Sequence, residues 1–419
     1  MINKTNKDLP ISQEASNWGL KQTIAVVLSL LFIGYLAYGL FFAPAIFMDD
    51  WTSVIERIVT NNAQWLDTTQ RRPLLFSTFL LQNQLFGLNI TAYYISLWFL
   101  YIVMALLLYL IIARLPLHFS NLFGFITAAL FLVFPTNYTH MWLIMFGVYC
   151  ATTLTLLYGY LLLRFSQKGG WIIYALALIC LLIPLGIYEG QLGVASTWAL
   201  ILFVIYFRQN TIAKRIGLLI PVILMGIYAL WRTFGYQAAG VTDQYLSQVV
   251  TSPILLLSRL ILGYKITLGW GWTSAVVDFI PWVSSAKIAV LMLIIIVSAL
   301  LFTCWFVFQL KSEKEDANND TWFGNERRSN IYPYLFAVMC GFILIGAGYF
   351  PTITVFLPSL SGIGSRFNIF ATIGGAVTIT ALLMIISILI SGNKEQVKYY
   401  FLISTTPFII IGIFLNASV

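Results

Sequence analysis

The sequence has very little charge. Charged residues make up 9% of its 419 residues, whereas hydrophobic residues make up 60% and aromatic residues 16%. The mean hydropathy is +0.89. A soluble domain of this length carries far more charge, so the composition excludes that class and predicts an integral membrane protein. Uninterrupted apolar runs of about 20 residues favour membrane-spanning helices over the alternating pattern of a β-barrel.

Cysteine is also scarce, and no internal repeat or separate soluble domain is visible. The four cysteines, Cys150, Cys180, Cys304 and Cys340, lie in or beside apolar runs, without a disulfide framework or metal-ligand spacing. They are interpreted as small buried residues. The net charge of +8 comes from basic residues dispersed among the connections between apolar runs, so the sequence predicts no nucleic-acid partner.

The apolar runs predict an all-α transmembrane bundle of about eleven spans. Residues 1–419 form one integral-membrane domain, with 1–20 as a cytoplasmic tail and 311–330, which holds nine charges, as a cytoplasmic loop. The expected spans are Thr23–Ala43, Thr91–Ala113, Phe119–Pro135, Leu143–Leu163, Trp171–Ile187, Gln191–Phe207, Ile216–Trp231, 288–308, 332–350, 368–391 and 398–415.

Two segments do not fit a simple span. Residues 44–90 predict a large first extracytoplasmic loop that ends in an interfacial helix at 74–86 and a turn at Gly87–Asn89. Residues 232–286 predict an extracytoplasmic or interfacial segment. Within it, an outside loop with tryptophans near Gly and Pro holds one amphipathic or re-entrant helix near 253–268.

The distribution of Lys and Arg orients the chain. With the N-terminus in the cytoplasm, 15 of the 23 basic residues fall on the cytoplasmic side. Every expected cytoplasmic loop then carries basic charge, as the positive-inside rule requires. The remaining eight are Arg57, Arg71, Arg72, Arg232, Arg259, Lys265, Lys287 and Arg366.

The expected first loop carries the most concentrated charge. Asp49 and Asp50 follow the first span, and Arg71 and Arg72 close the loop. Carboxylates at that depth are costly unless they face water, a partner or a substrate. A carboxylate with a tuned pKa can act as a base, and arginine binds phosphate through two parallel hydrogen bonds. The alternatives are an N-cap on a helix starting near Trp51 and arginines that extend to the membrane surface.

Further candidate site residues lie at the same expected face. Each could instead have a purely structural role: the histidine as a hydrogen-bonded core residue, the glutamate in an ion pair between helices, the arginines as interfacial anchors and the tryptophans as aromatic belt residues. Glu189 is a reserve candidate for the base, because its turn could lie under the first loop. The candidates for binding substrate are Trp51, Trp65, His140, Arg232 and Arg366.

Several short motifs resemble one family. MDDW in the first loop, RRPL at its end and LFGLN before the next span are similar to membrane glycosyltransferases of the GT-C class. The likeness is strongest to the branch with the serotype-converting glucosyltransferases and O-mannosyltransferase relatives. FPTNYTHMW, IYEGQL and GSRFNIF extend it. Two departures are Tyr188, where lysine is common, and Thr139-His140, where an acidic residue is usual.

The resemblance implies a GT-C fold and a reaction. A sugar would pass, usually with inversion, from a polyprenyl-phosphate-linked donor to a glycan, glycolipid or protein acceptor at the extracytoplasmic face of a plasma or inner membrane. In related enzymes the first acidic residue of the pair is commonly the base, which favours Asp49 over Asp50. If a divalent metal takes part, these two carboxylates are its expected ligands. The sequence leaves metal dependence open.

Two other functions compete with glycosyl transfer. One is a transporter or flippase of a lipid-linked or anionic solute, and the other is a polymerase or ligase of lipid-linked glycans. Transporters often place charged groups near the middle of the bilayer and use paired repeats. Here the charges lie at one expected face and no repeat is visible, so transfer is favoured over transport.

The topology can be tested by cysteine labelling in intact cells. In a variant without the native cysteines, Asn318→Cys in the expected cytoplasmic loop should react with a membrane-impermeant maleimide only after permeabilisation. A cysteine at Asn61 in the first loop should react without it. Strong labelling of Asn318→Cys in intact cells would contradict the proposed orientation.

Overall fold

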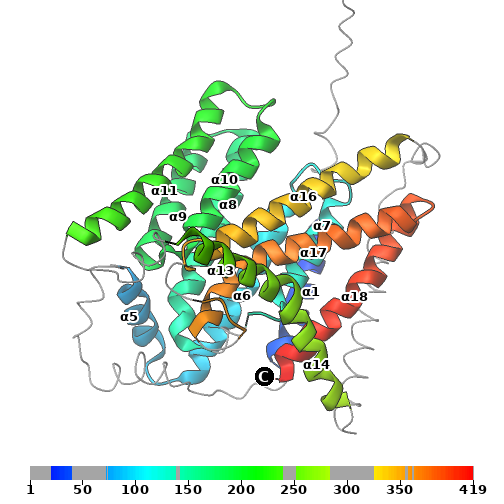
Figure 1. Cartoon of the computed structure of the whole chain (residues 1–419), viewed down its shortest axis with the longest axis horizontal. Coiled ribbons are helices and arrows are strands. Elements are labelled where there is room, and N and C mark those ends of the chain that lie inside the picture. Colours follow the sequence, from blue (N-terminus) through cyan, green and yellow to red (C-terminus); the bar gives the residue numbers. More distant parts are fainter. Residues whose placement is uncertain are drawn as a thin grey trace, which may run out of the picture.

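The computed structural model describes residues 20–39, 72, 74–137, 142–238, 252–283, 325–353, 357–360 and 363–418. Within these ranges the chain is helical and contains no strand. Eight of the described helices are long and apolar enough to cross a membrane. The described part of the chain is therefore that of a multi-pass, all-helical membrane protein (Figure 1).

The helices follow the apolar runs of the sequence. Their bounds are α1 Leu20–Tyr38, α5 Leu75–Phe86, α6 Ile90–Ile112, α7 Ser120–Leu132, α8 Phe146–Lys168, α9 Trp171–Ile187, α10 Leu192–Tyr206, α11 Ile212–Ala238, α13 Pro253–Lys265, α14 Gly271–Val283, α16 Asn325–Tyr349, α17 Asn368–Ile390 and α18 Lys394–Ser418. Short turns precede some of them: η4 Leu143–Met145, η5 Glu189–Gln191 and η7 Ile363–Phe367. The span expected at 288–308 lies outside the described residues, so eleven spans and a GT-C fold stay predictions.

The short helix after the expected first loop is confirmed. It was expected at 74–86, and α5 covers Leu75–Phe86. Gly87 ends it with a φ of 53°, a left-handed conformation that glycine adopts without strain, and Asn89 caps α6 by accepting from the Ala92 N–H. The outward side of α5 carries the exposed Leu80, Leu81 and Leu85.

Helix α17 forms the centre of the bundle. Every residue from Phe367 to Ala381 is buried, and α17 packs against α7, α16 and α18 (Figure 1). A helix that is apolar on all sides can be enclosed by protein or by lipid. The apolar sequence of α17 is therefore compatible with its central place but does not by itself determine it.

Glycines allow α16 and α17 to approach closely. A Cβ atom on Gly374 of α17 would lie 2.5 Å from the Gly341 carbonyl oxygen and 2.5 Å from the Ile345 nitrogen of α16. Both atoms belong to the backbone, so no side-chain movement can make room. Small residues at helix interfaces are the usual means of close packing within a membrane.

The segment expected as a loop around 269–283 is helical, so that expectation is wrong. Helix α13 continues through a π-helical turn, η6 Ile266–Trp270, into α14, which ends at Val283. The clustered glycines and tryptophans indicated a loop. Gly271 instead allows close contact with Thr136, because a Cβ atom there would overlap the threonine side chain.

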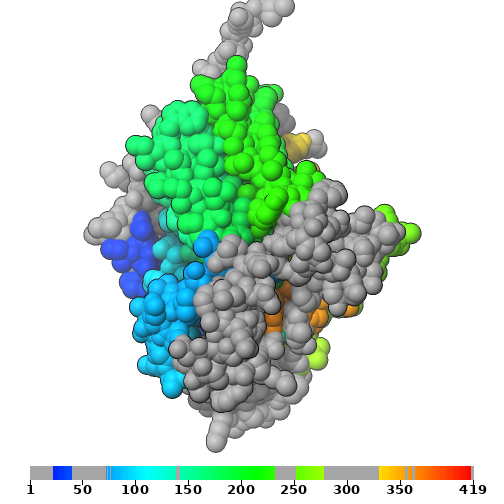
Figure 2. All heavy atoms as spheres, turned by 90° about the vertical axis from the view of Figure 1, so that its left-hand side faces the viewer, coloured from blue at the N-terminus to red at the C-terminus, as the bar shows by residue number. Residues whose placement is uncertain are grey.

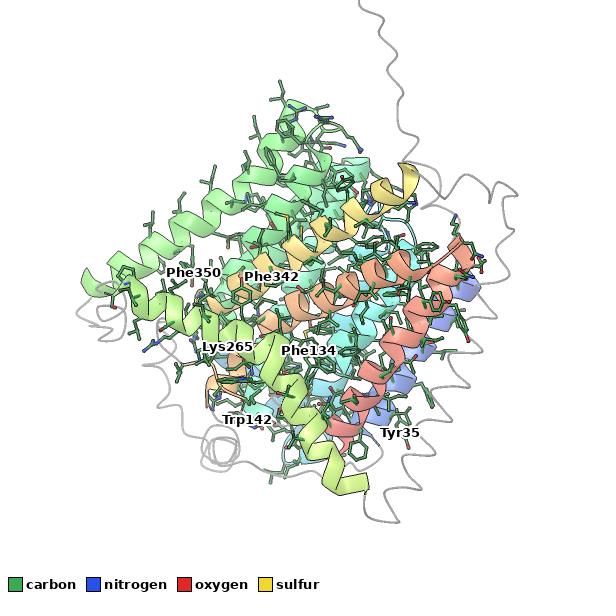
Figure 3. All side chains as sticks on the ribbon, turned by 45° about the vertical axis from the view of Figure 1, so that its right-hand side comes forward. Tyr35, Phe134, Trp142, Lys265, Phe342 and Phe350 are labelled. Carbon is green, nitrogen blue, oxygen red and sulfur yellow. The ribbon has the colours of Figure 1, made fainter. Side chains whose placement is uncertain are left out.

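The helical segment 253–283 crosses the ends of other helices (Figure 3). Arg259 Nη1 donates to the Ile353 carbonyl, and Tyr264 OH donates to the Phe342 carbonyl. The Trp272 ring meets the Phe408 ring of α18 edge-on. Although residues 253–277 are long enough to span a membrane, these contacts place the segment on the C-terminal halves of α16 and α18. Those halves are the expected extracytoplasmic ones.

The close contact at Gly374 predicts that a glycine-to-alanine substitution changes stability differently at two sites. Gly374→Ala should destabilise the protein by about 1–3 kcal/mol, because the added methyl group forces two backbones apart. Gly226→Ala in α11 is the matched control. Outside the backbone of its own helix, no described atom lies within 4 Å of a Cβ there, so alanine should be neutral or stabilise the helix by up to about 1 kcal/mol. Thermal unfolding of the detergent-purified variants measures both, and equal effects would contradict the packing argument.

Candidate functional site

Two distant sequence segments meet where the expected first loop ends. The Leu74 N–H donates to the Gly186 carbonyl at 2.9 Å, which joins the start of α5 to the end of α9. In Figure 1, α5 lies beside the lower ends of α8 and α9. Figure 2 shows the same side of the molecule, with α5 and α6 in blue below α9–α11 in green. The motifs RRPL and IYEGQ are thus neighbours in space, although Arg72 and Glu189 are 117 positions apart in the sequence.

Arg72 and Glu189 form an ion pair with two hydrogen bonds. Arg72 Nε donates to Glu189 Oε2 at 2.9 Å, and Arg72 Nη2 donates to Oε1 at 2.7 Å. The side chains are 30% and 17% exposed. Burial opposes the charge of Arg72, but the attraction and hydrogen bonds of Glu189 outweigh it and raise the arginine pKa. The guanidinium is therefore charged and fixed in orientation.

Tyr188 lies between Arg72 and the aromatic residues at the start of α17. The Arg72 guanidinium lies over the Tyr188 ring, 4.3 Å from its centroid. The Tyr188 ring stacks on Phe367 at 6.3 Å with an interplanar angle of 23°, and lies 5.9 Å from the Phe370 ring. Arg72, Tyr188 and Phe367 thus form a stack that links the end of the expected first loop to η7.

A second arginine lies next to this stack. Arg366 immediately precedes Phe367 in η7, and its guanidinium lies 4.7 Å from the centroid of the Trp142 ring. Trp142 precedes η4 and α8, at the end of the bundle where η7 lies (Figure 3). Each arginine therefore rests on an aromatic ring, and such stacking suits guanidinium better than ammonium.

A buried polar network fixes the start of α17 just behind Arg366. Asn368 Nδ2 donates to the Thr136 carbonyl at 2.9 Å and to the Ser359 carbonyl at 3.0 Å. Asn368 Oδ1 accepts from the Tyr349 hydroxyl at 2.8 Å, and Tyr349 also hydrogen-bonds Thr267. This network joins α7, η6, α16 and α17, so η7 is attached to a rigid base.

The structure describes only some of the predicted site residues. It brings Arg72 and Glu189 into contact and places Arg366 beside the stack. The helix that carries Arg232 continues past the expected end at Trp231 to Ala238, but the Arg232 side chain is not described. The other candidates lie outside the described residues: Asp49, Asp50, Trp51, Trp65, Arg71 and His140.

Sequence reasoning missed four residues that organise this region. Tyr188 and Trp142 provide the rings under the arginines, Phe367 completes the stack, and Asn368 holds the network. Asn368 had a detectable signal, because it is a polar residue at the start of an otherwise apolar span. The aromatic residues lie within the motifs FPTNYTHMW, IYEGQL and GSRFNIF, but rings are abundant throughout the chain, so no role was assigned to them.

Among the residues that the structure describes, no group of three or more His, Cys, Asp or Glu side chains could hold a metal ion. The two carboxylates expected to bind any metal, Asp49 and Asp50, are outside that part of the chain. No family model, curated protein or solved structure matches this sequence. A function must therefore be argued from the residues and their geometry.

The ion pair predicts a large loss of stability at one glutamate and a small loss at another. Glu189→Gln leaves the partly buried Arg72 charge unbalanced, so it should destabilise the protein by about 1–3 kcal/mol. Glu395→Gln removes the partner of Lys398 in a pair at 2.8 Å with the carboxylate 44% exposed, and should cost less than about 1 kcal/mol. Thermal unfolding in detergent compares the two. A smaller effect at Glu189 than at Glu395 would contradict this assignment.

Proposed function

We propose that this protein is a membrane glycosyltransferase of GT-C type. It moves a sugar from a polyprenyl-phosphate-linked donor to a glycan, lipid or protein acceptor at the extracytoplasmic face. The observation that carries this proposal is the pair of arginines, Arg72 and Arg366, connected through Tyr188 and Phe367 at one end of the bundle. Guanidinium groups held in this way suit an anionic group that is recognised by shape as well as charge.

The free donors of Arg72 support a phosphate ligand. An arginine has five N–H donors, and Glu189 accepts hydrogen bonds from Nε and Nη2. Nη1 has no partner among the described residues. The Glu189 carboxylate holds the guanidinium plane, so its remaining edge needs no reorganisation to bind a phosphate.

The reaction assigns the two charged groups different tasks. The acceptor hydroxyl oxygen attacks the anomeric carbon, the bond from that carbon to the phosphate oxygen breaks, and a carboxylate takes the hydroxyl proton. Negative charge grows on the departing polyprenyl phosphate, where the arginines stabilise it. Asp49 is the proposed base and Asp50 the second choice. The pair can share one titration because adjacent carboxylates repel.

Glu189 is better suited to positioning than to proton transfer. Both of its carboxylate oxygens accept hydrogen bonds from Arg72. Accepting a proton would remove the charge that holds the guanidinium in place. We therefore assign Glu189 the role of orienting Arg72, and leave the base to the aspartates of the first loop.

The test separates binding of the donor phosphate from transfer of the sugar. Binding is measured as the thermal stabilisation of purified protein in nanodiscs by a polyprenyl phosphate, compared with the corresponding polyprenol. Transfer is measured separately, as release of polyprenyl phosphate with a panel of donors and acceptors. Asp49→Asn should bind the phosphate normally but transfer roughly a hundred- to ten-thousand-fold more slowly. Arg366→Lys keeps the charge but loses the planar fork, so it should weaken phosphate binding and transfer together.

Lys394→Arg, at the start of α18, changes a basic residue away from this site, so it is the control and should change neither measurement. Equal stabilisation of the wild-type protein by the phosphate and the alcohol would contradict the arginine assignment. Near-normal transfer by Asp49→Asn would reject Asp49 as the base. Equal loss in Asp49→Asn and Asp50→Asn would support the pair without choosing between them.

A further inference from the structure

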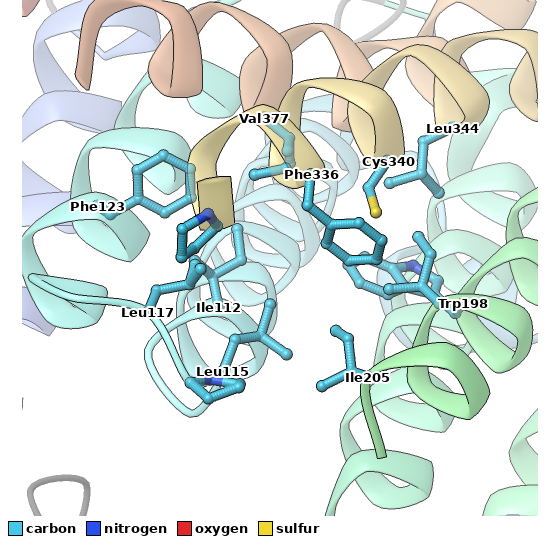
Figure 4. A pocket seen from close by; sticks show the side chains of 14 residues that line it. Ile112, Leu115, Leu117, Phe123, Trp198, Ile205, Phe336, Cys340, Leu344 and Val377 are labelled. Atoms are coloured by element: carbon cyan, nitrogen blue, oxygen red, sulfur yellow. The ribbon is translucent and has the colours of Figure 1, made fainter. Parts of the chain in front are cut away.

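A groove lies between α10, α16 and the connection from α6 to α7 (Figure 4). Its cavity volume is about 100 Å³, which is less than that of a typical ligand pocket and suits a slender group rather than a whole ligand. Every residue that lines it is apolar, including Leu115, Ile205, Phe336, Ala337 and Cys340. The groove and the arginine site lie toward opposite ends of α10. Glu189 precedes the start of this helix, whereas Ile205, which lines the groove, is close to its end.

Three connections meet at the end of the bundle where this groove begins. Gln167 Nε2, at the end of α8, donates to the Arg114 carbonyl at 2.8 Å and to the Tyr206 hydroxyl at 2.9 Å. Lys214 Nζ, at the start of α11, donates to the Ser166 carbonyl at 3.3 Å. These bonds tie together the α6–α7, α8–α9 and α10–α11 connections.

The three connections carry only positive charge. The sequence has no Asp or Glu between Asp67 and Glu189, or between Glu189 and Asp243. We call the basic residues at this end the cation cluster: Arg114, Arg164, Lys168, Arg208, Lys214 and Arg215. Arg114 directly precedes Leu115 and Arg208 follows Ile205 by three residues, and both of these apolar residues line the groove. Positive charge therefore borders an apolar groove.

A buried hydrogen-bond donor lies on the groove side of α16. Asn330 is 5% exposed, and its Nδ2 has no hydrogen-bond partner among the described residues. Pro333, Ala337, Cys340 and Leu344 of the same helix line the groove. Asn330 is one turn before Pro333 on that face, because residues three, four and seven apart share one side of a helix. A buried donor without an acceptor is costly, so an oxygen-rich ligand would stabilise this site.

We propose that the groove binds an acyl chain of an anionic membrane phospholipid. The phosphate lies at the opening of the groove, where the cation cluster and Asn330 Nδ2 interact with its oxygens. Basic pockets between membrane helices are suited to anionic headgroups. A peptide would fit poorly, because the lining side chains offer few partners for its backbone N–H and C=O groups. This site is separate from the proposed transferase centre and needs no sugar donor.

The proposal is tested by counting lipids on the intact protein. Detergent-purified protein is mixed with phosphatidylglycerol or phosphatidylcholine, and native mass spectrometry measures how much of each stays bound. The wild-type protein should retain phosphatidylglycerol preferentially. Ala337→Phe fills the groove and should lower that retention at least tenfold. Arg114→Gln should reduce the preference for phosphatidylglycerol about fivefold, the effect expected for one basic residue near an anionic lipid.

Leu335→Phe is the matched control, because Leu335 is on the same helix but 45% exposed. It should retain lipid like the wild-type protein. If Ala337→Phe does not fold, Ile205→Phe fills the groove from α10 and should have the same effect. Equal retention of the two lipids by the wild-type protein would overturn the proposal. So would equal losses in Leu335→Phe and Ala337→Phe.

Discussion

The pairing of Arg72 with Glu189 is the constraint on which the arrangement of one end of the bundle depends. In a chain with 9% charged residues, an ion pair between segments 117 positions apart is a specific link. Together with the Leu74–Gly186 backbone bond, it fixes where the expected first loop rejoins the bundle. The energy of such a pair is modest, since desolvation opposes the attraction. Its main effect is therefore on position, because two parallel hydrogen bonds allow one orientation of the guanidinium.

Aromatic rings extend this constraint where further charges would be costly. Tyr188 lies between the Arg72 guanidinium and Phe367, and Trp142 supports Arg366. A ring face attracts a cation without adding a charge that must be solvated. In the GT-C enzymes that the sequence resembles, lysine is common at the position of Tyr188. Tyrosine there gives Arg72 a supporting surface, whereas a second cation would repel it.

The sequence predicted the helices well where the apolar pattern was simple. The expected bounds of α9 agree with the structure at both ends, and α5 agrees within a residue. It failed at 269–283, because glycine and tryptophan indicated a loop while tertiary contacts with Thr136 and Phe408 support a helix. Glu189 could be predicted as a site residue from its charge. Tyr188 and Asn368 could not be given their roles, because those depend on neighbours that only the fold brings together.

The two ends of the described bundle use basic residues in opposite ways. Arg72 at one end has a carboxylate partner and an aromatic support, so its orientation is fixed before any ligand binds. The cation cluster at the other end has no carboxylate in its three connections, so its charge is available to a mobile, anionic surface. Fixed donors favour recognition of one group in one geometry, as catalysis requires. Cations without a carboxylate partner favour attraction without a single geometry, as orientation in a membrane requires. Under the two proposals made above, the same residue types would serve a site for chemistry at one end and a surface for lipid at the other.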